Sequence, residues 1–139
     1  FENLLEDRHA RDENEKSILN FFAYDGHSYL WMGDASVDVE RQLLLQYPLL
    51  KADILKLGHH GSKTSSSFEF LDHMNPKLSL ISVGTRNRYG HPDTVVLKRL
   101  RSLGISNLKT SEVGMIQLKS LYGLLFFRTG AGDFGIIPS

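Results

Sequence analysis

The first part of the chain with a clear hydrophobic pattern contains two short apolar runs separated by a turn signal. Residues 17–24 and 28–32 carry most of the large apolar side chains of this region, and Asp25 and Gly26 lie between them. Asp-Gly between two β-prone runs favours the tight turn of a β-hairpin. We therefore predict a pair of antiparallel strands here.

Downstream, apolar runs alternate with stretches whose apolar side chains recur at helical spacing. The pattern predicts, in chain order, a helix over 37–47, a strand over 53–57, a helix over 68–74, a strand over 78–83, a helix over 92–103, and strands over 105–110, 115–119 and 121–128. This alternation indicates an α/β (α+β layered) fold, with a mixed sheet and helices packed on it.

Capping and breaking residues set the expected ends of the helices. Pro48 stops the first helix, and Ser65 or Ser66 caps the second. Pro92 suits the first turn of the third helix, which Gly104 closes.

Charged side chains dominate the first 16 residues. We interpret residues 1–16 as a charged N-terminal arm in a loop conformation, and residues 17–139 as one partial domain. The chain opens on Phe1, without an initiator Met and without the basic start and apolar run of a signal peptide. We therefore expect it to be a piece of a longer protein.

Composition narrows the class of protein. A chain of 139 residues is long enough for one hydrophobic core. Its 16 basic residues equal its 16 acidic ones in number, so any binding of a polyanion must rely on a local group of basic residues. The absence of Cys excludes thiolate catalysis and thiolate zinc sites. The longest apolar stretches, such as 121–127, are far shorter than the roughly 20 residues that span a bilayer, so we expect a soluble domain.

Polar clusters follow three of the predicted strands. Asp34 comes after the second strand, His59 and His60 lie between two glycines after the third, and residues 87–91 come after the fourth. In α/β sheets such strand ends converge on one crevice. A carboxylate and several imidazoles in one crevice are ligands that suit Zn²⁺ or Mn²⁺.

Each cluster also has a structural interpretation. Asp34, taken alone, is typical of a helix cap or turn. The His pair is harder to explain in this way, because the flanking glycines remove bulk and leave the imidazoles open to a ligand. The 62–67 loop is either a linker or a set of hydroxyls that, with Lys63, hold phosphate oxygens.

The remaining histidines differ in their surroundings. His91 precedes a predicted helix, but it lies among basic and aromatic residues that favour a catalytic or phosphate-binding role. His9, His27 and His73 have no such neighbours and are interpreted as surface or structural residues.

Several separated motifs carry a family resemblance. Residues 52–67 (ADILKLGHHGSKTSSS), 81–84 (ISVG) and 87–92 (NRYGHP) closely resemble the metallo-β-lactamase-fold domain at the C-terminal end of ComEC-type competence proteins, which form the membrane channel for DNA uptake. The similarity extends over about residues 17–118 and includes Asp34 at the family's Gly-Asp metal motif. It implies the C-terminal portion of an αββα sandwich.

The resemblance implies a hydrolase that holds two divalent ions, Zn²⁺ or Mn²⁺. By motif match Asp34 is the bridging carboxylate, and His59 or His60 is the late metal ligand; we prefer His59 as the ligand and His60 as its phosphate-side partner. Asp34, His60 and His91 are accordingly the predicted catalytic residues. The predicted substrate contacts are Ser62, Lys63, Ser65, Asn87, Arg88 and Tyr89.

One motif of the family is missing. No His-x-His-x-Asp-His sequence occurs, and the early histidines His9 and His27 do not have its spacing. We therefore expect the first half of the family domain to be absent and the chain alone to be inactive. The two ions are expected in the intact domain and not necessarily in this chain.

The implied function is cleavage of phosphodiester bonds in DNA during natural competence, by a soluble domain on the extracytoplasmic side of a cell-membrane protein. The expected partners are DNA, either single strand or duplex, the membrane only through the parent protein, and a second copy of the chain at the uncovered sheet face. Two alternatives remain open: a non-catalytic module that binds DNA or a partner, and a small-molecule phosphodiesterase.

Overall fold

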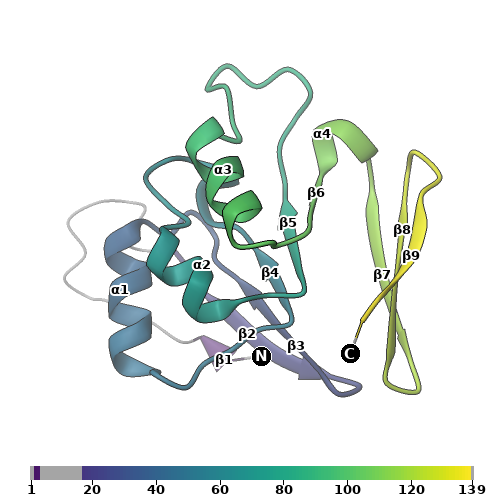
Figure 1. Cartoon of the computed structure of the whole chain (residues 1–139), viewed down its shortest axis with the longest axis horizontal. Coiled ribbons are helices and arrows are strands. Elements are labelled where there is room, and N and C mark those ends of the chain that lie inside the picture. Colours follow the sequence, from purple (N-terminus) through teal and green to yellow (C-terminus); the bar gives the residue numbers. More distant parts are fainter. Residues whose placement is uncertain (1, 4–16, 139) are drawn as a thin grey trace.

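The computed structural model describes residues 2–3 and 17–138. Six strands form one mixed sheet in chain order (Figure 1). The first three strands pair antiparallel and the last four pair parallel. The strands are β1 (Glu2–Asn3), β2 (Asn20–Tyr24), β3 (His27–Trp31), β4 (Ile54–Lys56), β5 (Leu78–Ile81) and β6 (Asn107–Lys109).

The predicted hairpin is confirmed. β2 and β3 pair antiparallel as far as Tyr24 and His27. Asp25 and Gly26 form the turn with φ of 48° and 82°, the positive values that a two-residue turn between twisted strands requires.

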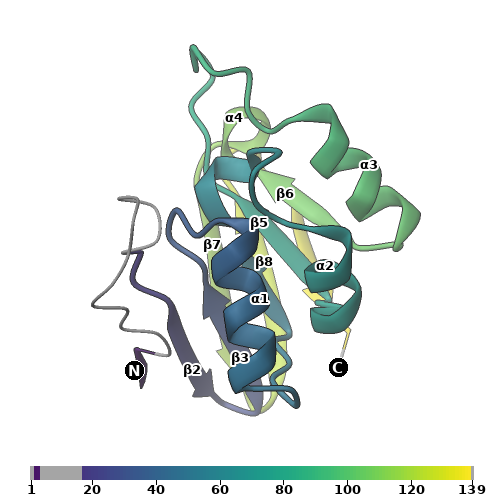
Figure 2. The same cartoon turned by 90° about the vertical axis from the view of Figure 1, so that its left-hand side faces the viewer.

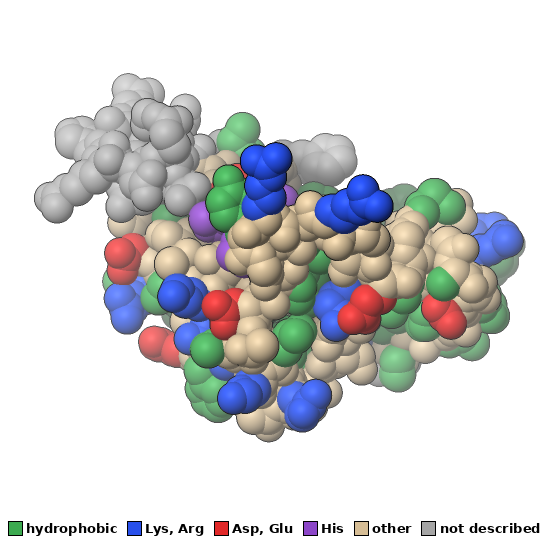
Figure 3. Space-filling view, turned by 90° about the horizontal axis from the view of Figure 1, so that it is seen from above, with side chains coloured by type: hydrophobic (Ala, Val, Ile, Leu, Met, Phe, Trp, Pro, Cys, Tyr) green, Lys and Arg blue, Asp and Glu red, His purple; other side chains and the backbone are tan. Residues whose placement is uncertain are grey.

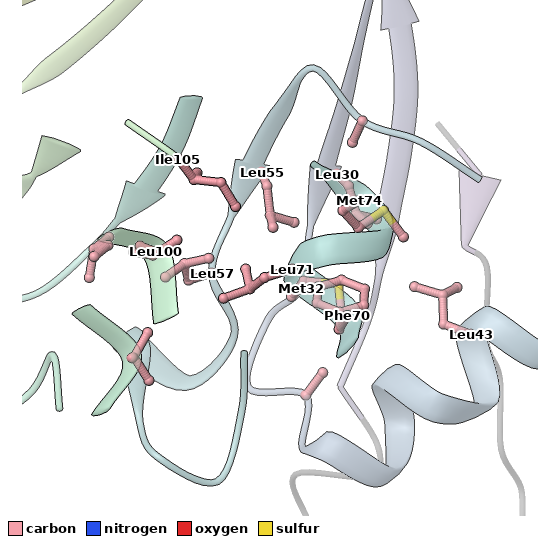
Figure 4. Packing of buried hydrophobic residues seen from close by; sticks show 14 of the residues in the cluster. Leu30, Met32, Leu43, Leu55, Leu57, Phe70, Leu71, Met74, Leu100 and Ile105 are labelled. Carbon is pink, nitrogen blue, oxygen red and sulfur yellow. The ribbon is translucent and has the colours of Figure 1, made fainter. Parts of the chain in front are cut away.

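Helices α1 (Val37–Gln46), α2 (Phe68–Met74) and α3 (Thr94–Ser102) cover one face of this sheet (Figures 1 and 2). Side chains alternate along a strand, so Leu30 and Leu55 point toward these helices. They pack there with fully buried side chains from each helix, as Figure 4 shows for Leu43, Phe70 and Leu100.

A second, three-stranded sheet lies against the opposite face. It consists of β7 (Ile116–Leu121), β8 (Leu124–Thr129) and β9 (Phe134–Ile137), all antiparallel. Leu125 and Ile137 of this sheet pack on Tyr29 and Ile54 of the larger one. The molecule is therefore layered as helices, mixed sheet and antiparallel sheet, which confirms the α+β layered fold.

Several predicted boundaries were wrong. Ser67, rather than Ser65 or Ser66, caps α2, because its side chain accepts the N–H of Phe70 while the two preceding serines lie in the buried loop before the helix. Asp93, rather than Pro92, begins α3 by accepting the N–H of Val95. The last predicted strand, 121–128, is not one strand. It includes the last residue of β7 and most of β8, and a turn at residues 122–123 separates these two strands.

Three short elements were not predicted. α4 (Thr110–Val113) and β9 have four residues each, too few for a periodicity to appear. β1 pairs with β2, so the expectation of a loop over residues 1–16 was wrong at residues 2–3; the rest of the predicted arm, with His9, lies outside the described residues. In the described part of the chain, no helix is long and apolar enough to cross a membrane.

Candidate metal and substrate site

Three loops meet at one edge of the mixed sheet. Residues 33–34 follow β3, the turn Gly58–Gly61 follows β4, and residues 82–93 follow β5. Because these three strands are parallel, the loops leave the sheet on the same side, as predicted. Backbone hydrogen bonds of 3.0 Å from His59 N–H to Gly33 O and of 2.9 Å from Asp93 N–H to Gly61 O hold them together.

The glycines on either side of the His pair allow this close approach. A Cβ atom at Gly58 would lie 2.8 Å from the carbonyl oxygen of Ala35, and one at Gly61 would lie 2.8 Å from Cβ of Pro92. Gly61 also has a φ of 78°, which favours glycine. The two glycines thus bring the turn against the loops that carry Asp34 and His91.

His59 and His60 both have left-handed backbone conformations, with φ of 45° and 55°. Few residues other than glycine adopt this region, and strain of this kind is typical of functional sites. Figure 3, which views the molecule from this edge, shows histidine side chains at the surface beside basic ones. The unusual turn therefore presents imidazoles at the loop edge of the sheet.

The two nitrogens of His60 have different neighbours. Nδ1 lies 2.6 Å from the carbonyl oxygen of Ser82, and Nε2 lies 3.8 Å from Oδ1 of Asp34. A carbonyl oxygen only accepts, so Nδ1 carries a proton and donates it. In the neutral form of the ring, the Nε2 lone pair then faces Asp34. Metal-binding histidines are commonly oriented in this way by a backbone carbonyl.

His59 lies between His60 and His91, with ring centroids 6.4 Å and 5.8 Å away. Its Nδ1 is buried and has no hydrogen-bond partner among the described residues. Burial lowers the pKa of His91, and His59 and His60 lower it further, although Asp93 acts in the opposite direction. The pKa of His91 therefore lies below its ordinary value, which favours the neutral form of the ring.

The loop after β5 presents an exposed aromatic ring. Asn87 braces this loop, since its Oδ1 accepts the N–H of His91 at 2.7 Å and its Nδ2 donates to the carbonyl oxygen of His91 at 2.9 Å. Tyr89 stacks on His91, with centroids 5.9 Å apart and planes 17° apart, yet is 84% exposed. Arg86 and Arg88 precede it in the chain and are exposed.

The serines after the His pair face inward. Ser62 is buried, and its hydroxyl contacts Thr64 Oγ1 at 3.0 Å. Ser65 is fully buried, with its hydroxyl 2.8 Å from the carbonyl oxygen of Gly58. Ser65 thus lies too deep to contact a substrate, contrary to the expectation from the sequence, whereas Lys63 is exposed.

Sequence reasoning missed three charged residues around the site. Glu40 is buried at a position of α1 flanked by Val39 and Leu43, and an acid on the core-facing side of a predicted helix was the available signal. Arg99 lies in the last turn of α3 and contacts the loop before α2. Burial lowers the pKa of Lys56 at the end of β4, and the charge of Asp34 opposes this effect.

Two other histidines have structural roles, as predicted. His27 is buried, and its Nε2 lies 2.9 Å from the carbonyl oxygen of Gly123. His73 Nε2 lies 3.1 Å from the carbonyl oxygen of Leu50.

The donor set fits part of a metal site. The 3.8 Å between His60 Nε2 and Asp34 Oδ1 is too long for a hydrogen bond, but it is near the roughly 3.4 Å that separates two ligand atoms about 2.1 Å from a tetrahedral zinc ion. Over the described ranges, no three His, Cys, Asp or Glu side chains form a group that could hold an ion. These residues therefore offer an incomplete ligand set.

No known protein-family profile matches the chain. It is 35% identical over 126 residues to ComE operon protein 3 of Bacillus subtilis (strain 168), and 38% identical over 107 residues to competence protein ComA of Neisseria gonorrhoeae. It is 31% identical over 109 residues to recombination protein 2 of Haemophilus influenzae.

These alignments cover 91%, 76% and 78% of this chain, but only 15%, 16% and 14% of the respective relatives. The chain thus spans about one seventh of the length of the curated relatives that it matches. Across that segment, the chain belongs to the family of ComEC-type competence proteins.

Proposed function

We propose that this chain is part of a metal-dependent phosphodiester hydrolase that acts on DNA during DNA uptake. The observation that carries the proposal is the approach of His60 Nε2 to Asp34 Oδ1 at 3.8 Å, with Nδ1 of the same ring held by the carbonyl oxygen of Ser82. The names of the relatives support a role in competence. We also propose that the chain has part of a metallo-β-lactamase fold. Its layer of helices and its two sheets support this, because they correspond to three of the four layers of an αββα sandwich.

In this proposal Asp34 and His60 hold a divalent ion, Zn²⁺ or Mn²⁺. The unpartnered Nδ1 of His59 cannot reach solvent, so His59 is proposed to serve the site through its other ring nitrogen. Such an ion, when bound, lowers the pKa of a water molecule to about 7 and polarises a phosphoryl oxygen. The longer protein would supply the ligands beyond these, on the extracytoplasmic side of the membrane.

The loop over residues 84–91 favours a nucleic acid over a small phosphodiester. Tyr89 offers a flat exposed ring, and Arg86 and Arg88, which precede it in the same loop, offer exposed cations. Exposed aromatic rings among basic residues stack on unpaired bases and contact the backbone phosphates of single strands. We therefore propose single-stranded or locally opened DNA as the substrate.

A module that binds DNA without cleaving it is the second candidate, because the described residues provide an incomplete ligand set. The two candidates differ in the effect of ligand substitutions. Asp34→Asn and His60→Ala abolish cleavage by a hydrolase, whereas a binding module retains its salt-dependent affinity for DNA in both variants.

The deciding experiment uses the full-length protein with Mn²⁺ or Zn²⁺ and labelled single-stranded and duplex DNA. We expect metal-dependent cleavage that falls roughly 100-fold or more in Asp34→Asn and His60→Ala, since even groups behind metal ligands commonly contribute 10- to 100-fold. His73→Ala is the matched control, because His73 contacts the carbonyl oxygen of Leu50 instead of the site. Absence of cleavage with either metal would contradict the proposal.

A further inference from the structure

The loop between the His pair and α2, residues 62–67, is entirely polar in sequence, yet three of its six residues are buried, whereas Lys63 and Thr64 are exposed. Ser62, Ser65 and Ser66 are 6%, 0% and 1% exposed. Each buried N–H and C=O group requires a hydrogen-bond partner. In this loop, two charged side chains from different helices provide several of these partners.

Glu40 of α1 binds the N–H groups at the end of the loop. Its Oε1 accepts the N–H of Ser66, and its Oε2 accepts the N–H of Ser67 at 2.9 Å. The residue is 1% exposed. Burial raises the pKa of Glu40, while the hydrogen bonds from Ser67 and Ser66 and the charge of Arg99 oppose that change.

Arg99 of α3 binds the carbonyl groups of the same segment. Its Nη1 donates to the carbonyl oxygen of Ser66 at 2.9 Å and lies 3.3 Å from that of Ser65. The N–H of Ser66 thus faces a carboxylate and its C=O faces a guanidinium. The residue between these charges has a φ of 52°, another left-handed conformation.

This segment is connected directly to the turn that carries the His pair. The hydroxyl of Ser65 lies 2.8 Å from the carbonyl oxygen of Gly58 and 3.0 Å from that of Ser62. The N–H of Ser62 in turn donates to the carbonyl oxygen of His59 at 2.9 Å. A shift of Ser65 would therefore displace both ends of the turn.

We propose that Glu40 and Arg99 are positioning residues. By holding residues 65–67, they fix the left-handed turn that carries His59 and His60. Neither residue is assigned to substrate or metal. The claim about the loop goes beyond the proposed function and does not depend on it. Only the effect on DNA cleavage that we expect from substituting Glu40 rests on the proposed function.

Nuclear magnetic resonance of the 139-residue chain tests the proposal through the ring signals of His59 and His60 and the amide exchange of Ser66 and Ser67. Glu40→Gln offers one acceptor oxygen instead of two, so one N–H loses its partner. We expect at least tenfold faster exchange at Ser66 or Ser67 and shifted His ring signals. Arg99→Met removes the other contact and should shift the same ring signals.

Leu43→Ala is the matched control. Leu43 lies one turn from Glu40 on α1 and is fully buried in the core. Its truncation lowers the unfolding temperature, but its apolar side chain makes no hydrogen bond to the loop that could be lost. All spectra are recorded where each variant is fully folded. Ring signals that move no more in Glu40→Gln and Arg99→Met than in Leu43→Ala would overturn the proposal.

A second readout separates this inference from the proposed function. In a full-length protein that cleaves DNA, Glu40→Gln should lower kcat about 10- to 100-fold, the usual range for groups that orient metal ligands. A wild-type protein without cleavage counts against the proposed function, and the ring signals of the short chain still decide the role of Glu40 and Arg99.

Discussion

His60 and Tyr89 show how individual side chains at this site depend on their immediate neighbours. The left-handed backbone at His60 and the carbonyl oxygen of Ser82 direct its Nε2 toward Asp34. Tyr89 rests on His91 and presents its other face to solvent. In the proposed function, the ring of His60 faces the cation and the ring of Tyr89 stacks on a base.

Tyr89 leads to a prediction about binding. We expect Tyr89→Leu to weaken the affinity of the full-length protein for single-stranded DNA about 5- to 150-fold, because stacking of a base on an aromatic ring contributes about 1–3 kcal/mol. Tyr89→Phe keeps the ring and should bind as the wild type does. Fluorescence anisotropy with a labelled oligothymidine at fixed salt measures the effect, and equal affinities for all three proteins would contradict it.

At the residue scale, the sequence indicated which residue types form the candidate site, but not which of their side chains contact one another. The glycine-flanked His pair and the carboxylate after β3 are visible as motifs, and the structure brings Asp34 to His60. The ring that approaches Asp34 depends on two positive φ angles, which no local pattern specifies for histidine. The preference for His59 as the metal ligand remains a prediction, and the inward direction of Ser65 depends on packing between α1 and α3.

Strands β3, β4 and β5 carry the candidate site at one end and a structural polar cluster at the other. Asp53, directly before β4, accepts hydrogen bonds from Ser28 N–H at 2.8 Å and Ser28 Oγ at 2.9 Å, and pairs with Lys77 Nζ at 2.9 Å. Burial acts to raise the pKa of Asp53, but the hydrogen bonds from Lys77 and Ser28 outweigh it, so this pKa lies below its ordinary value. The cluster joins the beginnings of three parallel strands.

A pH-dependent stability follows from this cluster. A lowered pKa in the folded state means that Asp53 stabilises the protein above about pH 4 and that this contribution is lost as the pH falls through the folded-state pKa. We expect Asp53→Asn to lower the free energy of unfolding by about 1–2 kcal/mol at pH 7, a modest value because the carboxylate is partly exposed. Urea denaturation from pH 7 to pH 3 should show the difference shrinking, and a difference independent of pH would contradict this.

The elements themselves were largely predictable, because strands β2 to β5 and helices α1 to α3 each have an apolar pattern of several residues. The second sheet was less predictable from the sequence. Its β9 follows a glycine-containing turn and has only four residues, and its position depends on the packing of Ile137 against the larger sheet. Tertiary contacts of this kind leave no local signal.

At the scale of the whole molecule, the outer side of the second sheet carries apolar side chains that no other described element covers. Leu121, Leu124, Phe134 and Ile136 are each about half exposed or more, and Phe126 stacks on Phe134 at 6.1 Å. Large exposed apolar patches are typical of contact surfaces. We expect the 139-residue chain to self-associate through this face.

Sedimentation equilibrium tests this expectation. Phe134→Ser should weaken the association, whereas Leu45→Ser on α1, which removes an even more exposed apolar side chain from the helical side, should not. Lys119 and Arg128 border the apolar patch, so added salt should strengthen the association by screening their repulsion. A chain that stays monomeric at high concentration would contradict the expectation.

The central claim of this account is that Asp34 and the His pair are the ligands that this chain contributes to a metal site. The most direct measurement is a Mn²⁺ titration of the 139-residue chain, with paramagnetic broadening of each backbone amide as the signal. Because this chain offers an incomplete ligand set, the account predicts weak but saturable broadening centred on residues 34, 59 and 60, and its loss in the double variant Asp34→Asn, His60→Ala. Broadening that is absent, that centres on another part of the molecule, or that persists unchanged in the double variant would contradict it.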